Sequence, residues 1–142
     1  MADIDEARSW TDNAAGDIRV AKHLLSTMHP IPVEIIGFHS QQATEKSLKA
    51  VLAYNETVIP RTHEITELVN ICKTFGACFD IPEAVADTIT EYAVKVRYKQ
   101  ELRDFTENDA EFAVKHAEKV IDMVENYLGK FMSDSCVQIK QE

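Results

Sequence analysis

Apolar residues recur at helical spacing in several separate stretches of this chain, with polar residues between them. The first stretch, residues 4–27, repeats its apolar positions at intervals of three, four and seven residues, which predicts an amphipathic helix. Asp3 stands three residues before Glu6 and is expected to cap this helix. The segment His29-Pro30-Ile31-Pro32 must end it, because proline lacks a backbone donor and restricts its predecessor. A second helix is then expected over residues 33–54.

Two shorter stretches predict a third and a fourth helix. Thr62 is positioned to cap the third helix, and Gly76 is a plausible stop after its apolar face. Cys72 lies on that face, which indicates a small buried hydrophobe and not a nucleophile. Pro82 suits the first turn of the fourth helix. Gly37, near the start of the second helix, would let another part of the backbone approach closely.

The last long stretch predicts the longest helix. Thr106 and Asp109 form a capping-box pattern at its start, and Gly129 is expected to end it. Only four Gly and four Pro occur in the chain, which favours long helices over a sheet. The sequence therefore predicts one all-α domain over residues 1–130, an up-and-down bundle of about five helices, followed by a tail at 131–142 that is mobile or forms a short added helix.

Composition narrows the classes of partner. The net charge is −9, from 24 acidic and 15 basic residues, so the protein as a whole repels polyanions and binding to duplex DNA is not expected. The three cysteines form no CxxC pair, no apolar run is long enough for a membrane span, and no leader is visible, so we expect a cytoplasmic protein. Basic residues nevertheless crowd the middle of the chain and leave a local basic site possible: Lys46, Lys49, Arg61, Lys95, Arg97, Lys99 and Arg103.

The segment Phe38 to Tyr54 carries the most unusual pattern. On a helical projection one narrow polar stripe runs along an otherwise apolar-walled cylinder, and it contains His39, Gln42, Lys46 and Lys49. This stripe is either a line of ligand-binding groups or an ordinary solvated face. In the second case Glu45 and Lys49 form a common i,i+4 pair that contributes a few tenths of a kcal/mol.

Standard catalytic signatures are missing. The chain contains no HExxH, GxSxG, glycine-rich phosphate loop or EF-hand loop. His63 and Glu67 are expected one turn apart on the third helix and could touch one metal ion, but no third ligand follows at a useful spacing. We therefore expect neither a metal nor another cofactor.

Three separated motifs carry a resemblance to a known family. They are Phe38-His39-Ser40-Gln41-Gln42-Ala43-Thr44-Glu45-Lys46-Ser47-Leu48-Lys49-Ala50, then Arg61-Thr62-His63-Glu64-Ile65, then Arg97-Tyr98. In this order they resemble the HEPN family, the nucleotide-binding domain of higher eukaryotes and prokaryotes, over about residues 5–129. The resemblance implies an all-α domain that often homodimerises and is commonly encoded beside a minimal nucleotidyltransferase in prokaryotic toxin–antitoxin pairs. It also implies that many branches cleave RNA without a metal.

The chain departs from the pattern of the family's nucleases. Their signature is an Arg followed, after four to six residues, by a His. Arg97 matches this Arg, but residues 102–104 contain no His, and no other arginine has one at that distance. An arginine can hold a phosphate bidentately but is too basic to shuttle protons. His39 or His63 could take the acid–base role if the fold brings one of them within reach.

Together these observations favour a homodimeric HEPN protein that binds a nucleotide or an RNA phosphate and works with a nucleotidyltransferase. The expected ligand-binding residues are Lys46, Lys49, Arg97, Tyr98 and His63, with Gln42 and Glu45 orienting the cations. A first alternative is a metal-independent ribonuclease toxin that uses Arg97 with His39 or His63. A second is an interaction module, in which Gln42, Glu45 and Lys49 become buried when two chains associate.

Overall fold

The computed structural model describes the backbone of residues 3–98 and 105–141, and the side chains of residues 3–93 and 105–129. These residues form five helices and no strand. The all-α bundle predicted from the sequence is thereby confirmed. The helices are α1 (Ile4–Thr27), α2 (Val33–Tyr54), α3 (Ile65–Lys73), α4 (Glu83–Tyr98) and α5 (Glu107–Gln141).

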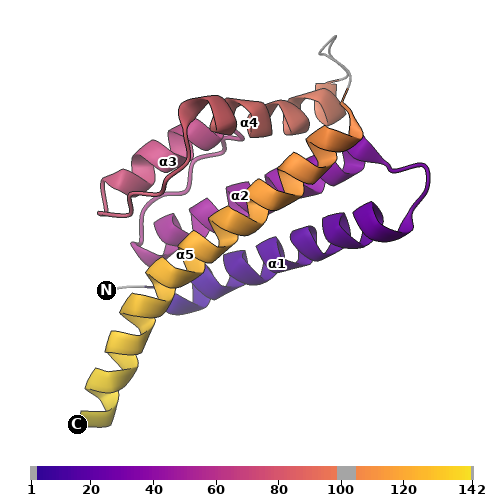
Figure 1. Cartoon of the computed structure of the whole chain (residues 1–142). Coiled ribbons are helices and arrows are strands. Elements are labelled where there is room, and N and C mark those ends of the chain that lie inside the picture. Colours follow the sequence, from indigo (N-terminus) through magenta and orange to yellow (C-terminus); the bar gives the residue numbers. More distant parts are fainter. Residues whose placement is uncertain (1–2, 99–104, 142) are drawn as a thin grey trace.

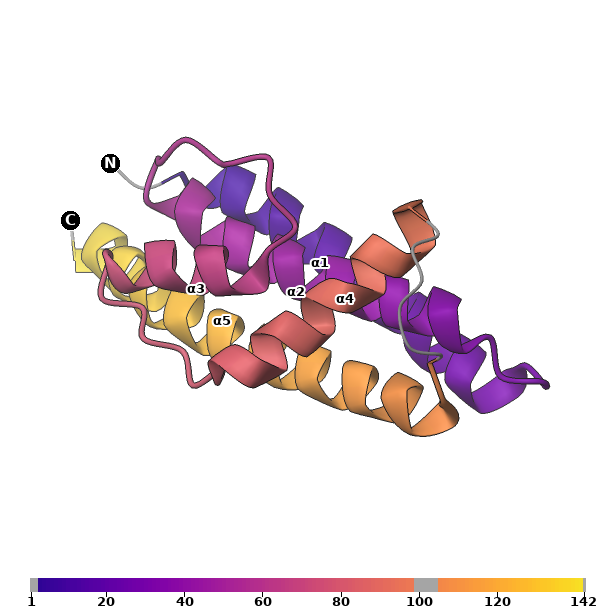
Figure 2. The ribbon, with the colours of Figure 1, turned by 90° about the horizontal axis from the view of Figure 1, so that it is seen from above.

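Helix α2 is the centre of the bundle. It contacts each of the other four helices. The long helices α1 and α5 run beside it, and the shorter α3 and α4 form a second layer on one side (Figures 1 and 2). Of its 22 residues, 16 are buried. One interpretation of the sequence made the polar stripe of α2 a solvent-exposed face. In the structure most of this helix is buried instead.

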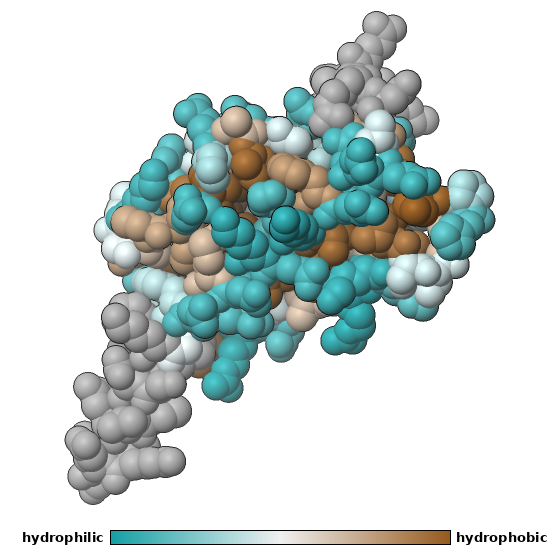
Figure 3. Space-filling view, in the orientation of Figure 1, coloured by the Kyte–Doolittle hydropathy of each residue, from teal (hydrophilic) through white to brown (hydrophobic). Residues whose placement is uncertain are grey.

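The outer surface is more polar than the core. Hydrophilic residues spread over the face that α5 presents to the viewer in Figure 3, with apolar residues between them. This is the distribution expected of amphipathic helices around one core. None of the helices in the described part of the chain combines the length and the apolar character that a membrane span requires.

Side-chain caps start two helices where the sequence predicts them. The Glu6 amide donates to Asp3 Oδ1 at 3.0 Å, at the N-terminus of α1. Thr106 and Asp109 satisfy one another reciprocally: the Thr106 amide donates to Asp109 Oδ2 at 2.8 Å, and the Asp109 amide donates to Thr106 Oγ1 at 3.3 Å. Each cap satisfies amides that lack a partner in the first helical turn.

The start of α3 differs from the prediction. The helix begins at Ile65, and Thr62 Oγ1 accepts from the Glu64 amide at 3.1 Å in the turn before it. The Ile65 amide donates to Thr90 Oγ1 on α4 at 3.1 Å, so a tertiary contact fixes the first turn. His63 consequently lies in the connection between α2 and α3 and not on α3 itself.

The end of α5 also differs from the prediction. The helix continues through Gly129 as far as Gln141, so the segment expected as a mobile tail or a short added helix extends α5 instead. A glycine inside a helix costs only ~1 kcal/mol relative to alanine. Favourable helical turns on either side of it can offset this cost. A Cβ added at Gly129 would meet no atom within 4 Å, so the position is open and places no packing constraint on the helix.

Of two predicted core positions, one is corrected and one is confirmed. A Cβ at Gly37 would lie 3.2 Å from the Tyr92 ring, so this glycine makes room for a side chain of α4 and not for the backbone segment that the sequence predicted. Cys72 is fully buried, and burial raises the pKa of its thiol to about 12. Such a thiol is inert at neutral pH, as expected of a small core residue.

Candidate functional site

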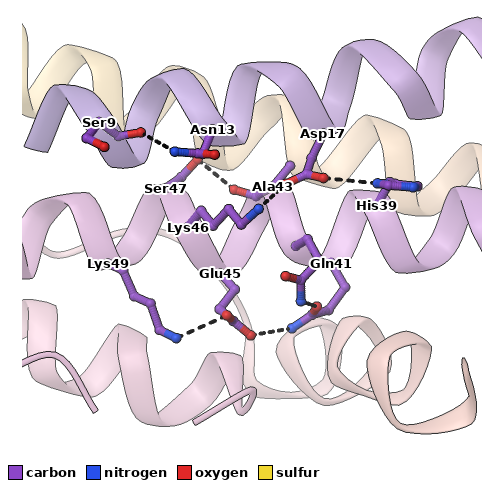
Figure 4. Close-up of polar contacts among 11 residues, drawn as sticks. Ser9, Asn13, Asp17, His39, Gln41, Ala43, Glu45, Lys46, Ser47 and Lys49 are labelled. Atoms are coloured by element: carbon purple, nitrogen blue, oxygen red, sulfur yellow. Dashed lines mark hydrogen bonds and ion pairs between the residues drawn. The ribbon is translucent and has the colours of Figure 1, made fainter. Parts of the chain in front are cut away.

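The polar residues of α2 separate into two clusters, which corrects the single stripe predicted from the sequence. In Figure 4, His39 and Lys46 point toward α1, whereas Gln41, Glu45 and Lys49 point to the opposite side of the helix. Each cluster has one carboxylate at its centre. The first is organised by Asp17, a residue of α1, and the second by Glu45 of α2 itself.

The Asp17 cluster joins α1 to α2. His39 Nδ1 lies 2.9 Å from Asp17 Oδ1, and Lys46 Nζ lies 2.7 Å from Asp17 Oδ2. The ammonium of Lys46 is thus neutralised within the chain. A shallow hollow beside this cluster is lined by Asp12, Asn13, Gly16, Asp17, Val20 and Lys46.

The Glu45 cluster is more deeply buried. Lys49 Nζ lies 3.0 Å from Glu45 Oε2, and His63 Nδ1 lies 2.7 Å from Glu45 Oε1. The side chains of Glu45 and Lys49 are 5% and 8% exposed, whereas that of His63 is 33% exposed. The cluster therefore has a buried ion pair at its base and a partly exposed imidazole at its mouth.

Gln41 fixes the position of the segment that carries His63. Its Nε2 donates to Glu45 Oε1 at 3.1 Å and to the His63 carbonyl at 3.3 Å. Its Oε1 accepts from Gln42 Nε2 at 2.7 Å. Gln42 therefore contributes to the cluster through Gln41. The spacing of four residues between Gln41 and Glu45 was the only sign in the sequence that these two side chains would meet.

The charge of Glu45 is set by opposing effects. Burial raises the pKa of this carboxyl, but hydrogen bonds from His63, Gln41 and Lys49, together with the charge of Lys49, outweigh burial and bring the pKa below 4.5. Glu45 is therefore ionised at neutral pH. An ionised carboxylate only accepts hydrogen bonds, so it stabilises donors on every side.

An aromatic ring on α1 completes the base of this cluster. Lys49 Nζ lies 5.8 Å from the centroid of Trp10, within the range of a cation–π contact. Neither Trp10 nor Asp17 belonged to the set of site residues predicted from the sequence. Both lie on α1, and no motif in the sequence distinguishes Asp17 from the other acidic residues of that helix.

The remaining predicted site residues are Arg97 and Tyr98. They form the last turn of α4, and their side chains lie outside the described residues. Thr90 marks the point where α4 meets the start of α3. Arg97 follows Thr90 by seven residues, which corresponds to ~10 Å along a helix. Arg97 therefore lies about two turns along α4 from the residue that contacts Ile65.

Two further expectations can be compared with this geometry. His63 precedes α3 and directs Nδ1 to Glu45, not to Glu67. Within the described part of the chain, no three His, Cys, Asp or Glu side chains are grouped as a metal site would require. If the protein were an interaction module, Gln42, Glu45 and Lys49 were expected to become buried when two chains associate. All three are already buried in the single chain.

Comparison with known proteins agrees with the fold. The model of the HEPN domain matches residues 7–127 of the chain. A protein of Methanocaldococcus jannaschii with the name "Putative toxin MJ1304" is 30% identical over 140 residues, which cover 88% of this chain and 90% of the relative.

Two solved structures share the fold. The crystal structure of TT1696 from Thermus thermophilus aligns with a TM-score of 0.68 and 23% identity, over 87% of this chain and 98% of that one. The structure of ST0689, described as an archaeal HEPN homologue, aligns with a TM-score of 0.63 and 21% identity, over 88% of this chain and 99% of that one. At these identities the likeness supports the architecture of the bundle.

Proposed function

The chain belongs to the HEPN domain family, and from this premise we propose that it is the toxin-type component of a two-protein system and binds a phosphate of a nucleotide or of single-stranded RNA. The toxin-type role is supported by the name of the Methanocaldococcus relative. The proposed partner is a minimal nucleotidyltransferase, and the proposed oligomer is a homodimer. Because the net charge is −9, the ligand must be recognised by a local site and not by the overall field.

The observation that carries the proposal is the arrangement of His63. Its ring is one-third exposed, yet Nδ1 is held by a carboxylate that is 5% exposed. A partly exposed imidazole with a fixed orientation is suited to contact a phosphate or a ribose hydroxyl. By their match to the family motif, Arg97 and Tyr98 would complete the site.

The two lysines of α2 have different roles in this proposal. Lys46 is bound to Asp17 and Lys49 to Glu45, so each cation is already compensated. Lys49 is also only 8% exposed, which leaves little of its ammonium accessible to a phosphate. We therefore assign Lys46 to holding the Asp17 carboxylate and Lys49 to holding the Glu45 carboxylate. Glu45 acts on the ligand through His63, and Gln42 contributes through Gln41.

Calorimetric titration with ATP and with a short single-stranded RNA tests this proposal. His63→Ala and Arg97→Ala are expected to abolish the heat of binding. His23→Ala and Arg19→Ala are matched controls, because both residues are exposed on α1 and outside the site, and they should leave binding unchanged. Equal affinity in the wild type and in both site variants would refute the assigned site.

The same geometry favours a second candidate, metal-independent cleavage of RNA. A carboxylate on Nδ1 orients an imidazole and stabilises the imidazolium that forms when the other ring nitrogen takes a proton. The RNA in the titrated samples should then shorten in the presence of a chelator. His63→Ala would reduce the rate by ~10²–10⁴. RNA that stays intact with the wild type would reject cleavage and leave the binding proposal in place.

Purification with the partner tests the two-protein part of the proposal. Co-expression with the nucleotidyltransferase encoded nearest to the gene should yield a complex that stays together during size-exclusion chromatography. Separate elution of the two proteins, at concentrations where each is folded, would contradict a stable pair. This outcome would not affect the nucleotide-binding proposal.

A further inference from the structure

The two oxygens of Glu45 serve different neighbours. Oε2 receives the hydrogen bond from Lys49 Nζ at 3.0 Å. Oε1 faces His63 Nδ1 at 2.7 Å and also receives the hydrogen bond from Gln41 Nε2. The carboxylate is thus held in one rotational position by groups on both sides. Among the described residues, Lys49 is the group that occupies the oxygen turned away from the imidazole.

Lys49 is not placed to meet a ligand. Its side chain is 8% exposed, and its ammonium lies between Glu45 and the Trp10 ring. Burying an ammonium costs several kcal/mol, and an apolar residue of similar volume is often as stable or more stable at such a site. The burial of Lys49 therefore calls for a role other than stability alone.

We propose that Lys49, supported by Trp10, is a positioning residue for His63. By holding Oε2 of Glu45, it directs Oε1 to the Nδ1–H of His63 and so makes Nε2 the nitrogen that meets the nucleotide or RNA. This inference rests on the proposed function, because it assigns how the same site is kept in its binding geometry. The chain of contacts crosses three segments: Trp10 on α1, Lys49 and Glu45 on α2, and His63 before α3.

The chemistry of the carboxylate explains the selection. An ionised carboxylate carries no proton to donate, so the imidazole nitrogen bonded to it must carry the hydrogen. In the neutral ring the lone pair then resides on Nε2. Nε2 can accept a proton from a hydroxyl or, once protonated, can donate to a phosphate oxygen, and Glu45 stabilises the resulting cation. Without Lys49, the buried carboxylate would lose its counter-ion and the hydrogen bond on Oε2.

The proposal is tested first on the wild-type protein. Nitrogen-15 NMR of the imidazole side chains, with His63 assigned by its disappearance in His63→Ala, reports which ring nitrogen carries the hydrogen. In mildly alkaline buffer we expect His63 in the Nδ1–H form alone. The Nε2–H form, or an even mixture of the two, would overturn the proposal without any variant.

Three substitutions then test the role of Lys49. Lys49→Met keeps the length of the side chain and removes the charge, and we expect it to give a mixture of both ring forms. Lys49→Arg should restore the Nδ1–H form. Lys22→Met is the matched control, because Lys22 also pairs with a glutamate at 3.1 Å but is 55% exposed and belongs to the α1–α5 contact.

An unchanged His63 signal in Lys49→Met would overturn the proposal. If Lys49→Met does not fold, Trp10→Leu decides instead, because it leaves every charge in place and removes only the ring beneath the ammonium. A mixture of ring forms in Trp10→Leu is then the expected result, and the wild-type pattern would overturn the proposal.

Ligand affinity separates this inference from the proposed function. Lys49→Met should weaken ATP or RNA binding about tenfold, the equivalent of one lost charge-assisted hydrogen bond. Suppose that Lys49→Met shows mixed ring forms of His63 and still binds the ligand as tightly as the wild type does. That result would overturn the link between positioning and binding. If the wild type binds neither ATP nor RNA but every variant shows the expected ring forms, the proposed function is refuted. The positioning role of Lys49 is then upheld.

Discussion

Lys49 Nζ lies 3.0 Å from Glu45 Oε2, and both side chains are more than nine-tenths buried within a single chain. The sequence pattern suggested an exposed i,i+4 pair contributing a few tenths of a kcal/mol. Burial changes the magnitude, because removing one partner leaves an uncompensated charge in the interior. We expect Lys49→Ala to lower the free energy of unfolding by about 3–5 kcal/mol, measured by urea denaturation.

Lys22→Ala is the control for this prediction. Lys22 and Glu118 form an ion pair of similar length, 3.1 Å, with side chains that are 55% and 44% exposed. Exposed pairs contribute less than ~1 kcal/mol, so this variant should unfold close to the wild type. Equal losses in Lys22→Ala and Lys49→Ala would contradict the interpretation of Glu45 and Lys49 as a buried pair.

The lowered pKa of Glu45 predicts a dependence of stability on pH. Because its folded pKa lies below its unfolded value of 4.5, the unfolded chain binds the proton more readily. The stabilisation by the carboxylate is therefore complete above 4.5 and is lost as the pH falls through the folded pKa. Glu45→Gln lacks this titration, so the difference in urea midpoint between wild type and variant should shrink below pH 4.5. A difference that stays constant across this range would contradict the prediction.

Two buried serines of α2 make a matched pair. Ser40 Oγ has no hydrogen-bond partner among the described residues, whereas Ser47 Oγ donates to the Ala43 carbonyl at 2.8 Å. A buried hydroxyl without a partner costs roughly 1–3 kcal/mol. Ser40→Ala should therefore raise the thermal unfolding temperature, while Ser47→Ala leaves it unchanged or lowers it. A loss of stability in Ser40→Ala would show that the hydroxyl has a partner.

Two helical glycines should respond in opposite directions to alanine. Gly16 on α1 has no atom within 4 Å of an added Cβ, so Gly16→Ala should stabilise the protein by ~1 kcal/mol. At Gly37 the added Cβ would lie 3.2 Å from the Tyr92 ring, and Gly37→Ala should destabilise by about 1–3 kcal/mol. Chemical denaturation of both variants measures the signs. Two changes of the same sign would contradict the packing of α2 against α4.

Most of the fold was predictable because it depends on local signals. The periodicity of residues 4–27 and the prolines after them predicted the bounds of α1, and the Thr106–Asp109 box predicted the start of α5. The two errors at helix ends have different causes. At Ile65 a tertiary contact from Thr90 fixes the first turn of α3. At Gly129 the helix continues, because a glycine costs only ~1 kcal/mol in a helix and is a weak stop signal.

The candidate site was less predictable, because its geometry depends on contacts between segments distant in the sequence. Glu45 and Lys49 were identified as a pair, since four residues separate them on one helix. Asp17 and Trp10 were not, because only the packing of α1 on α2 brings them to the lysines. His63 was identified through a motif, but its position before α3 depends on the bond between Ile65 and Thr90.

His63, held by Glu45, is the proposed point where the protein meets a nucleotide or RNA, and its own imidazole signal can report that contact. The signals of the histidine rings in the wild-type protein are followed by NMR as a short single-stranded RNA is added. We predict that the His63 signal shifts and saturates with the ligand, while that of the exposed His23 on α1 does not move. Saturable binding that leaves the His63 signal in place would contradict the proposal and move the site elsewhere on the bundle.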